Sequence, residues 1–296
     1  MTNAQSMHGK ICLVTGATSG IGQVTAKALA AQGAEVLIVG RNEQRTRDTA
    51  QQIRVETGND SVYYFLADFS DLSQVSGLAV NFKNKYSRLD VLINNAGAYF
   101  NARRKTPYGV ESTFLVNHLA PFLLTNLLLE VMRNSAPARI VNVASNAHHN
   151  GTMDLSDLEL RRFYFGFQAY ARSKLANVLF TYELSRRLTG SGVTVNALHP
   201  GEVATNIFST DFSIFGPAIK WIVGRFALTP EQGADNSIYL ASSPEVEGLT
   251  GKYFVKREVA PSALISHDEK LARQLWEISE KITAQVLNQP LTLKTG

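Results

Sequence analysis

Short apolar runs alternate along the chain with longer segments whose apolar residues recur at helical spacing. The short runs have the length of buried strands, and we predict strands at residues 10–15, 35–39, 62–66, 89–93, 139–143, 192–198 and 249–255. The longer segments predict helices at residues 23–32, 72–86, 108–132, 170–188, 230–242 and 268–287. Strands that alternate with helices are typical of an α/β fold.

The length and composition of the chain favour one large domain. With 296 residues, 45% of them hydrophobic, the chain can bury a substantial core. We expect a single domain over residues 9–288, between a polar N-terminal tail (1–8) and a C-terminal tail (289–296). Residues 206–228 are apolar and aromatic, and they could form core, a substrate lid or an interfacial surface. We expect a lid, because a loop of this length in a compact domain is often functional.

The charge pattern argues against nucleic acid as a partner. The formal net charge is +4, and no block of Lys and Arg is dense enough to follow a phosphate backbone. The densest basic group is the triplet Arg103-Arg104-Lys105. We interpret this triplet as a solvated loop, and steering of an anionic substrate is the alternative.

Cysteine usage and hydropathy favour a reducing, cytoplasmic setting. The single cysteine, Cys12, lies in the apolar run 11–14, where a buried thiol behaves as a small hydrophobic group. The first ten residues are polar and do not resemble an export signal. The most apolar stretch, residues 119–132, is interrupted by polar residues and Pro, and we expect it to be too short to span a bilayer.

The strand at 10–15 runs directly into the glycine turn T-G-A-T-S-G-I-G and then into a helix. Glycines allow close approach of a backbone to a phosphate, and the N–H groups and dipole of a helix start favour negative charge. The spacing G-x-x-x-G-x-G differs from the commoner G-x-G-x-x-G, and three glycines can also form a turn with no ligand. We expect a pyrophosphate here, held by Gly16, Thr18, Ser19, Gly20, Ile21 and Gly22.

The second strand ends at Gly40-Arg41, about 20 residues after the glycine turn, where dinucleotide folds select their cofactor. NAD enzymes place a carboxylate at this point, whereas Gly40 cannot repel a 2′-phosphate and the Arg41 guanidinium can hold one. We therefore predict NADP(H) rather than NAD. A surface arginine without this role is the alternative.

Several other candidate cofactor contacts follow strand ends. Asp68, followed by Phe69, is placed where a side chain could reach an adenine, and Asn95-Ala96-Gly97 could line the cofactor and tie neighbouring strands. The turn after the strand 192–198 has the sequence H-P-G-E-V-A-T, and its Thr205 could bond a carboxamide. From this turn we include Pro200, Gly201, Val203 and Thr205.

Tyr170 and Lys174 lie four residues apart at the entry of an apolar helix, so they share one face. A nearby cation favours phenolate, and we expect it to lower the pKa of Tyr170 and make the phenol a usable acid and base. A solvated Tyr and Lys pair is the structural alternative. Ser145 follows the strand at 139–143 and is a candidate for holding a substrate oxygen, and Asn117 is a polar residue within an apolar helix.

Residues 146–169 contain two histidines and four aromatic residues, and they connect Ser145 to the Tyr170 helix. Adjacent histidines such as His148 and His149 point apart, and no spaced carboxylate or cysteine accompanies them. We expect no metal site and interpret the aromatics as the lining of a substrate mouth.

Taken together, TGATSGIG, NNAG, the Ser145 strand end and YARSK closely resemble the short-chain dehydrogenase/reductase family, over residues 9–287. The stretches VNHLAPFLLTNLL, RIVNVASNAHH, YARSKLANVLFTYEL and HPGEVATNI resemble its retinol-dehydrogenase-like branch, which includes many NADP-dependent carbonyl reductases. The resemblance implies a single doubly wound Rossmann-type domain, with a parallel sheet of about seven strands flanked by helices. Membrane-anchored members carry an apolar N-terminal helix that we do not find here, so we expect no transmembrane segment.

The resemblance also implies roles for the catalytic candidates. Tyr170 would be the acid/base, Lys174 would lower its pKa and bond the nicotinamide ribose, Ser145 would polarise a carbonyl, and Asn117 would order a water. The reaction would be hydride transfer between NADP(H) and a carbonyl or alcohol of a bulky apolar substrate. Reduction of an activated carbon–carbon double bond, as in protochlorophyllide reductase, and a non-catalytic NADP(H) sensor are the alternatives. The family often forms homodimers through the helices predicted at 108–132 and 170–188.

Overall fold

Eight strands form one sheet in the computed structural model, which describes residues 6–201 and 229–287. The strands are β1 (Ile11–Thr15), β2 (Glu35–Gly40), β3 (Val62–Leu66), β4 (Val91–Asn94), β5 (Ala138–Val143), β6 (Val193–His199), β7 (Tyr253–Val255) and β8 (Glu258–Val259). Their order is β3-β2-β1-β4-β5-β6-β7-β8, and all neighbours are parallel except β7 and β8. The strand order runs outward one way from β1 to β3 and the other way from β4 to β7, with β1 and β4 parallel, so the sheet is doubly wound, which confirms the predicted fold class.

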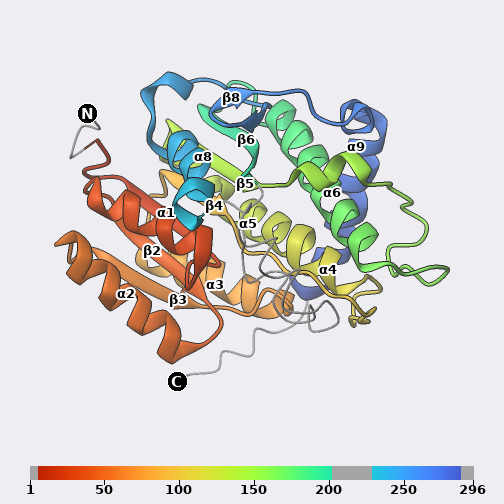
Figure 1. Cartoon of the computed structure of the whole chain (residues 1–296), viewed down its shortest axis with the longest axis horizontal. Coiled ribbons are helices and arrows are strands. Elements are labelled where there is room, and N and C mark those ends of the chain that lie inside the picture. Colours follow the sequence, from red (N-terminus) through yellow and green to blue (C-terminus); the bar gives the residue numbers. More distant parts are fainter. Residues whose placement is uncertain (1–5, 202–228, 288–296) are drawn as a thin grey trace.

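Helices cover both faces of the sheet (Figure 1). Contacts among α1 (Gly20–Ala31), α2 (Glu43–Thr57) and α8 (Pro230–Ser242) form one layer, and α3 (Leu72–Lys85), α5 (Ala120–Asn134) and α6 (Gly166–Arg187) lie on the opposite face. A last helix, α9 (Glu269–Leu287), packs on α6 and α3. Shorter turns of helix are α4 (Ser112–Phe114), η1 (Leu115–Leu119), η2 (Asn146–Asn150), η5 (Pro244–Val246) and η6 (Leu264–His267).

The alternation of side chains along each strand divides the core into two halves. In β1, Leu13 points into the cluster under α3, α5 and α6, whereas Cys12 and Val14 point into the cluster under α1 and α8. A sheet buried on both faces explains why its strands are continuous apolar runs rather than alternating ones. Cys12 is a buried free thiol, as predicted, and burial raises its pKa.

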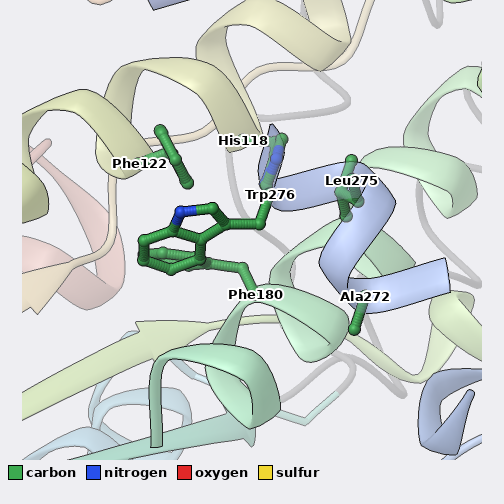
Figure 2. Close-up of a pocket in the computed structure, with 6 residues that line it drawn as sticks. All are labelled: His118, Phe122, Phe180, Ala272, Leu275 and Trp276. Carbon is green, nitrogen blue, oxygen red and sulfur yellow. The ribbon is translucent and has the colours of Figure 1, made fainter. Parts of the chain in front are cut away.

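Helix α9 is anchored by Trp276, whose indole lies against Phe122 of α5 and Phe180 of α6 (Figure 2). The ring centroids are 4.9 Å and 5.8 Å from that of Trp276. The hydroxyl of Ser279 accepts a hydrogen bond from His118 Nε2 at 3.0 Å and donates one to a carbonyl of its own helix. The chain's own last helix thus packs against both helices that the resemblance assigns to dimerisation, and whether two chains pair stays a prediction.

The helix predicted over residues 108–132 differs in the structure. Helical structure begins at Ser112, passes through the π-turn η1 and continues as α5 to Asn134. Residues 108–111 are not helical, because Glu111 caps the start by accepting hydrogen bonds from the N–H groups of Thr113 and Phe114. The helical run Ser112–Asn134 is long and apolar enough to cross a membrane by length and composition, contrary to our expectation, yet 72% of its apolar window is buried within the fold.

Two further differences concern the C-terminal third. The strand predicted at 249–255 covers only Tyr253–Val255, and β8 follows it through a turn in which Lys256 and Arg257 have positive φ. The predicted start of α8 is confirmed, because Thr229 and Gln232 form a reciprocal capping box with Pro230 at the first helical position. The predicted lid at 206–228, the candidates Val203 and Thr205, and the C-terminal tail lie outside the described residues.

Candidate active site

The glycine turn after β1 packs closely against Asn95 and Ala96, which follow β4. Gly16 has φ +64°, and a Cβ added there would lie 2.8 Å from Ala96 Cα. A Cβ on Gly22 would lie 2.3 Å from Asn95 Nδ2 and 2.6 Å from Gly16 O. The amide of Asn95 donates to the carbonyls of Thr15 and Gly16 at 2.8 Å and 3.2 Å. These glycines are therefore required by the packing of T-G-A-T-S-G-I-G on N-N-A-G.

The start of α1 fits an anionic group. Ser19 occupies the N-cap position, but its side chain makes no capping hydrogen bond to the first turn, and the turn contains no acidic residue. By contrast, Asn42 caps α2 and Asp71 caps α3 through their side chains. The uncapped N–H groups of α1, at the carboxyl edge of the sheet, have the arrangement that binds a pyrophosphate.

The end of β2 leaves no room for the carboxylate of an NAD-type site at residue 40. A Cβ on Gly40 would lie 2.3 Å from Thr46 Oγ1 and 2.5 Å from Thr18 Cγ2. Arg41 is exposed, and Arg45 Nε donates to the carbonyl of Thr18 at 3.2 Å. Arg41 thus directly follows β2 and Arg45 contacts the glycine turn, and either guanidinium is able to hold an anionic group.

At the end of β3, the predicted adenine contacts Asp68 and Phe69 are partly used by the fold itself. Asp68 Oδ1 accepts hydrogen bonds from the N–H and hydroxyl of Ser70, so this carboxylate also stabilises the turn that leads into α3. The ring of Phe69 is buried in the core, which leaves its backbone as the part that could contact a cofactor.

Asn117 sits in the π-turn η1 and joins three segments. Its Oδ1 accepts from the Ala98 N–H at 2.7 Å, and its Nδ2 donates to the Ala98 carbonyl and to Ser173 Oγ, both at 2.9 Å. The widened turn brings this amide out of the regular helical path toward α6, and such turns are common at functional sites. Gly97 lies beside it, where an added Cβ would be 3.5 Å from Asn117 Oδ1 and 3.8 Å from Lys174 Nζ.

Tyr170, Lys174 and Ser145 meet at the carboxyl ends of β4 and β5. The structure places Tyr170 and Lys174 on one face of α6, with Lys174 Nζ 5.5 Å from the Tyr170 ring centroid. The Lys174 ammonium donates to the Val143 carbonyl at 2.8 Å, two residues before Ser145. Burial raises the pKa of Tyr170 to about 12, and a hydrogen bond with Ser145 acts in the opposite direction.

The expected lowering of the Tyr170 pKa is therefore wrong for this arrangement of the chain. Both groups are buried, and desolvation of the phenolate outweighs the other influences. Burial also lowers the pKa of Lys174 to about 8, since its charged form loses solvation. The phenol is consequently in its protonated form at neutral pH, ready to donate a proton.

The rings of the adjacent His148 and His149 do not point apart as expected, because their centroids are 4.1 Å from each other, and His148 connects segments within the fold. His148 is buried, its Nδ1 donates to the Ser145 carbonyl at 2.7 Å, and its Nε2 accepts from the Ala263 N–H at 3.0 Å. With both ring nitrogens engaged in this way, the imidazole is neutral, and burial lowers its pKa to about 4. Among residues 6–201 and 229–287, no cluster of three or more His, Cys, Asp or Glu side chains suits a metal ion.

An aromatic group adjoins Tyr170. The ring of Tyr99 lies edge-on to it at 5.9 Å, and the Tyr164 hydroxyl donates to the Phe100 carbonyl at 2.5 Å. Phe163 and Phe165 are exposed beside this group. The remaining described candidates, Pro200 and Gly201, follow β6 at the same sheet edge and are partly exposed, Gly201 with φ +89°.

Three residues at this edge were missed by the sequence analysis. Thr15 Oγ1 accepts from the N–H groups of Asn95 and Ala96, both at 3.0 Å, and donates to the Ile93 carbonyl. Arg45 and Tyr99 contact the glycine turn and Tyr170 as described above. Thr15 could have been suspected as the last strand residue before the first glycine, whereas the contact of Tyr99 depends on the tertiary fold.

Comparison with known proteins places this site in a family. The model of the short chain dehydrogenase family matches residues 10–213, and the chain belongs to this family. It is 42% identical over 278 residues to human retinol dehydrogenase 11, with 94% of this chain and 87% of that protein covered. The protein is thus a retinol-dehydrogenase-like oxidoreductase of the short-chain family.

Solved structures agree with this assignment. An uncharacterised protein from Mycobacterium paratuberculosis superposes with a TM-score of 0.76, at 34% identity over 94% of each chain. The NADP complex of RhlG from Pseudomonas aeruginosa superposes with a TM-score of 0.69, at 28% identity, covering 86% of this chain and 97% of that one. A nicotinamide cofactor is therefore supported for this chain.

Proposed function

We propose that the chain is an NADP-dependent oxidoreductase that interconverts a carbonyl and an alcohol on a bulky apolar substrate, with Tyr170 as acid and base. The observation that carries this proposal is the convergence of Ser145, Tyr170, Lys174 and Asn117 at one sheet edge, beside the glycine turn. A scaffold would not require a buried ammonium and a buried phenol beside each other.

Ser145 and Tyr170 form the pair that would act on the substrate oxygen. Their hydroxyls are hydrogen-bonded to each other, so one oxygen atom can be held by both. With its pKa raised to about 12, Tyr170 is protonated at neutral pH and suited to giving a proton to an oxygen that gains negative charge. Reduction of a carbonyl is the direction that uses this proton.

Lys174 and Asn117 would support this pair, Lys174 through its charge and Asn117 by fixing a backbone segment. The Lys174 ammonium, held by the Val143 carbonyl, places positive charge near the Tyr170 ring and favours the phenolate that remains after proton transfer. Asn117 holds the backbone of Ala98 on both its N–H and its carbonyl. This fixes the segment after N-N-A-G relative to α6.

The residues present fit a dinucleotide with a 2′-phosphate. The uncapped start of α1 suits the pyrophosphate, and Arg41 and Arg45 supply cations where Gly40 excludes a side chain. When bound, the nicotinamide supplies or accepts the hydride. The NADP complex of a related fold supports the same choice.

The substrate class is inferred from the surroundings of Tyr170. The ring of Tyr99 contacts it, the next residue Phe100 accepts a hydrogen bond from Tyr164, and Phe165 is the N-cap residue of the Tyr170 helix. An aromatic approach favours a bulky apolar molecule over a small polar one. The similarity to a retinol dehydrogenase points to the same class.

The test is oxidation of NADPH, and separately of NADH, against aliphatic, aromatic, steroid, quinone and retinoid carbonyls. We expect turnover with NADPH on a bulky member, and a loss of about a hundredfold or more in kcat for Ser145→Ala, since a donor to the developing oxyanion is removed. Ser156→Ala, which removes an exposed hydroxyl in the following loop, is the control. Near-normal turnover by Ser145→Ala would contradict the role of Ser145, and faster turnover with NADH would contradict that of Arg41.

A further inference from the structure

Two loops beside the active site form one firmly built surface. The segment before α4 (residues 99–111) and the segment between η2 and α6 (151–165) are joined by several hydrogen bonds. Arg103 Nε donates to the Glu159 carbonyl at 2.7 Å, and the Glu111 N–H donates to the Leu158 carbonyl at 3.0 Å. In Figure 1 the green segment before α6 extends outward at the right edge of the molecule.

The outer side of this surface carries aromatic rings. Tyr164 turns inward to the Phe100 carbonyl, and its two neighbours turn outward. Phe163 is 75% exposed and Phe165 is 56% exposed. Exposing two neighbouring phenylalanines to water is unfavourable, so these rings are expected to serve a contact rather than the stability of the fold.

The same side carries exposed basic side chains. Arg104, Lys105 and Arg162 are exposed, and within the described residues none of them forms an ion pair with a carboxylate. We call these three residues, with Phe163 and Phe165, the aromatic-basic rim. Arg104 also stacks over the Phe100 ring, 4.3 Å from its centroid.

The nearby carboxylates hold partners within these two segments, and Asp154 and Asp157 also attract Arg162. Glu159 is shared between Arg103 and Arg161, at 3.0 Å and 2.7 Å. Asp157 accepts the backbone N–H groups of Arg161 and Arg162, and Asp154 accepts from Ser156. Glu111 is buried at the start of α4. The rim therefore presents cations and rings at a surface where the carboxylates are buried, as Glu111 is, or already hold a partner, although Asp154, Asp157 and Glu159 are at least partly exposed.

We propose that the aromatic-basic rim docks the protein on an anionic lipid bilayer. Basic side chains gain from the negative surface potential of such a bilayer, and aromatic rings bury their apolar faces at its interface. A rigid surface loses less conformational entropy on contact than a flexible one. Arg104 of the rim stacks on Phe100, and the preceding residue Tyr99 contacts Tyr170, so docking brings the Tyr170 site near the bilayer surface.

Docking is measured as binding to vesicles and not as enzyme activity. The result is therefore independent of whether the proposed reaction is correct. The native protein is mixed with phosphatidylcholine vesicles and with phosphatidylcholine vesicles containing phosphatidylglycerol, and the bound fraction is followed by co-sedimentation at low and raised salt. We expect binding to the anionic vesicles only, weakened by salt. Failure to bind anionic vesicles, or equal binding to both kinds, overturns the proposal.

Variants then locate the contact. Phe163→Ser/Phe165→Ser should weaken binding about tenfold or more, and Lys105→Ala and Arg162→Ala about fivefold each. Leu264→Ser is the matched control, because Leu264 is 92% exposed but lies in η6, followed by Asp268 and Glu269. All changes are at exposed positions, and circular dichroism checks that folding is retained. A loss in the control as large as in the rim variants overturns the assignment to the rim.

Discussion

The glycine turn after β1 and the polar group around Tyr170 lie on the same edge of the sheet, but they are held in different ways. The turn depends on missing side chains, because a Cβ on Gly22 would lie 2.3 Å from Asn95 Nδ2 and 2.6 Å from a backbone oxygen. The polar group depends on hydrogen bonds between segments far apart in sequence, such as Asn117 with Ser173 and Lys174 with Val143. The first region is therefore sensitive to volume, and the second to the loss of polar partners and to pH.

The largest effect is expected from adding volume in the turn. Gly22→Ala forces Asn95 or the backbone of Gly16 to move, and we expect a loss of at least about 3 kcal/mol in the free energy of unfolding, together with loss of NADPH binding. Urea unfolding and cofactor fluorescence measure the two.

The control for this change is Gly77→Ala. Gly77 lies in α3 with nothing within 4 Å of an added Cβ, and its φ is not positive. We expect a gain of about 0.5–1 kcal/mol there, because alanine is the better helix former. Equal effects at the two positions would contradict the close packing of the turn.

Removal of the Asn117 amide should affect turnover next. Asn117→Ala leaves the Ala98 N–H and carbonyl and the Ser173 hydroxyl without this partner, and we expect kcat to fall about a hundredfold with a loss of about 2 kcal/mol in stability. Asn126→Ala, on the same continuous helix, is the control. Steady-state kinetics with NADPH measure both, and a change in KM without a change in kcat would contradict the positioning role.

Neutralising Lys174 should stabilise the protein while abolishing its activity. Burial lowers the Lys174 pKa from 10.5 to about 8, so keeping its charge costs about 3 kcal/mol at neutral pH. Loss of the hydrogen bond to Val143 offsets about 1 kcal/mol in Lys174→Met, which leaves a gain of about 2 kcal/mol.

The pH dependence of this gain follows from the direction of the shift. Below pH 8 the side chain is charged in both the folded and unfolded states, so the full gain is present. Between pH 8 and 10.5 the folded protein loses the proton first, its stability rises with pH, and the advantage of the variant disappears. Urea unfolding at pH 7 and pH 10.5 tests this, and an equal gain at both pH values would contradict it.

The smallest effect is expected from removing Arg41, which directly follows β2. Arg41→Ala should raise the KM for NADPH about tenfold and leave that for NADH unchanged, since one contact to the 2′-phosphate is removed. Arg47→Ala, an exposed arginine on α2, is the control. Equal changes for the two cofactors would contradict selection by Arg41.

The same contrast explains what could be predicted from the sequence. The glycine turn and the strand ends are local patterns, and the predicted strand at 62–66 and the start of α8 at Pro230 agree with the structure. The expectation that N-N-A-G ties neighbouring strands is confirmed by Asn94, which donates to Asn142 of β5 at 2.8 Å. The shared face of Tyr170 and Lys174 followed from helix geometry alone.

Features that depend on tertiary packing could not be predicted. The π-turn at Asn117 forms because this amide reaches Ala98 and Ser173, which are distant in sequence. The direction of the Tyr170 pKa shift depends on burial, which a four-residue spacing does not reveal. The contact of Trp276 with α5 and α6 likewise requires the whole fold.

The central claim, that Tyr170 moves a proton to or from the substrate oxygen, is tested most directly by Tyr170→Phe. NADPH oxidation with a bulky apolar ketone and NADPH binding by fluorescence are measured on the same sample. Tyr182→Phe is the control, because Tyr182 is a buried tyrosine on the same helix that bonds Ser262. We predict a fall of about a thousandfold or more in kcat for Tyr170→Phe with cofactor binding within about twofold of the native protein. Turnover within about tenfold of the native rate would contradict the account.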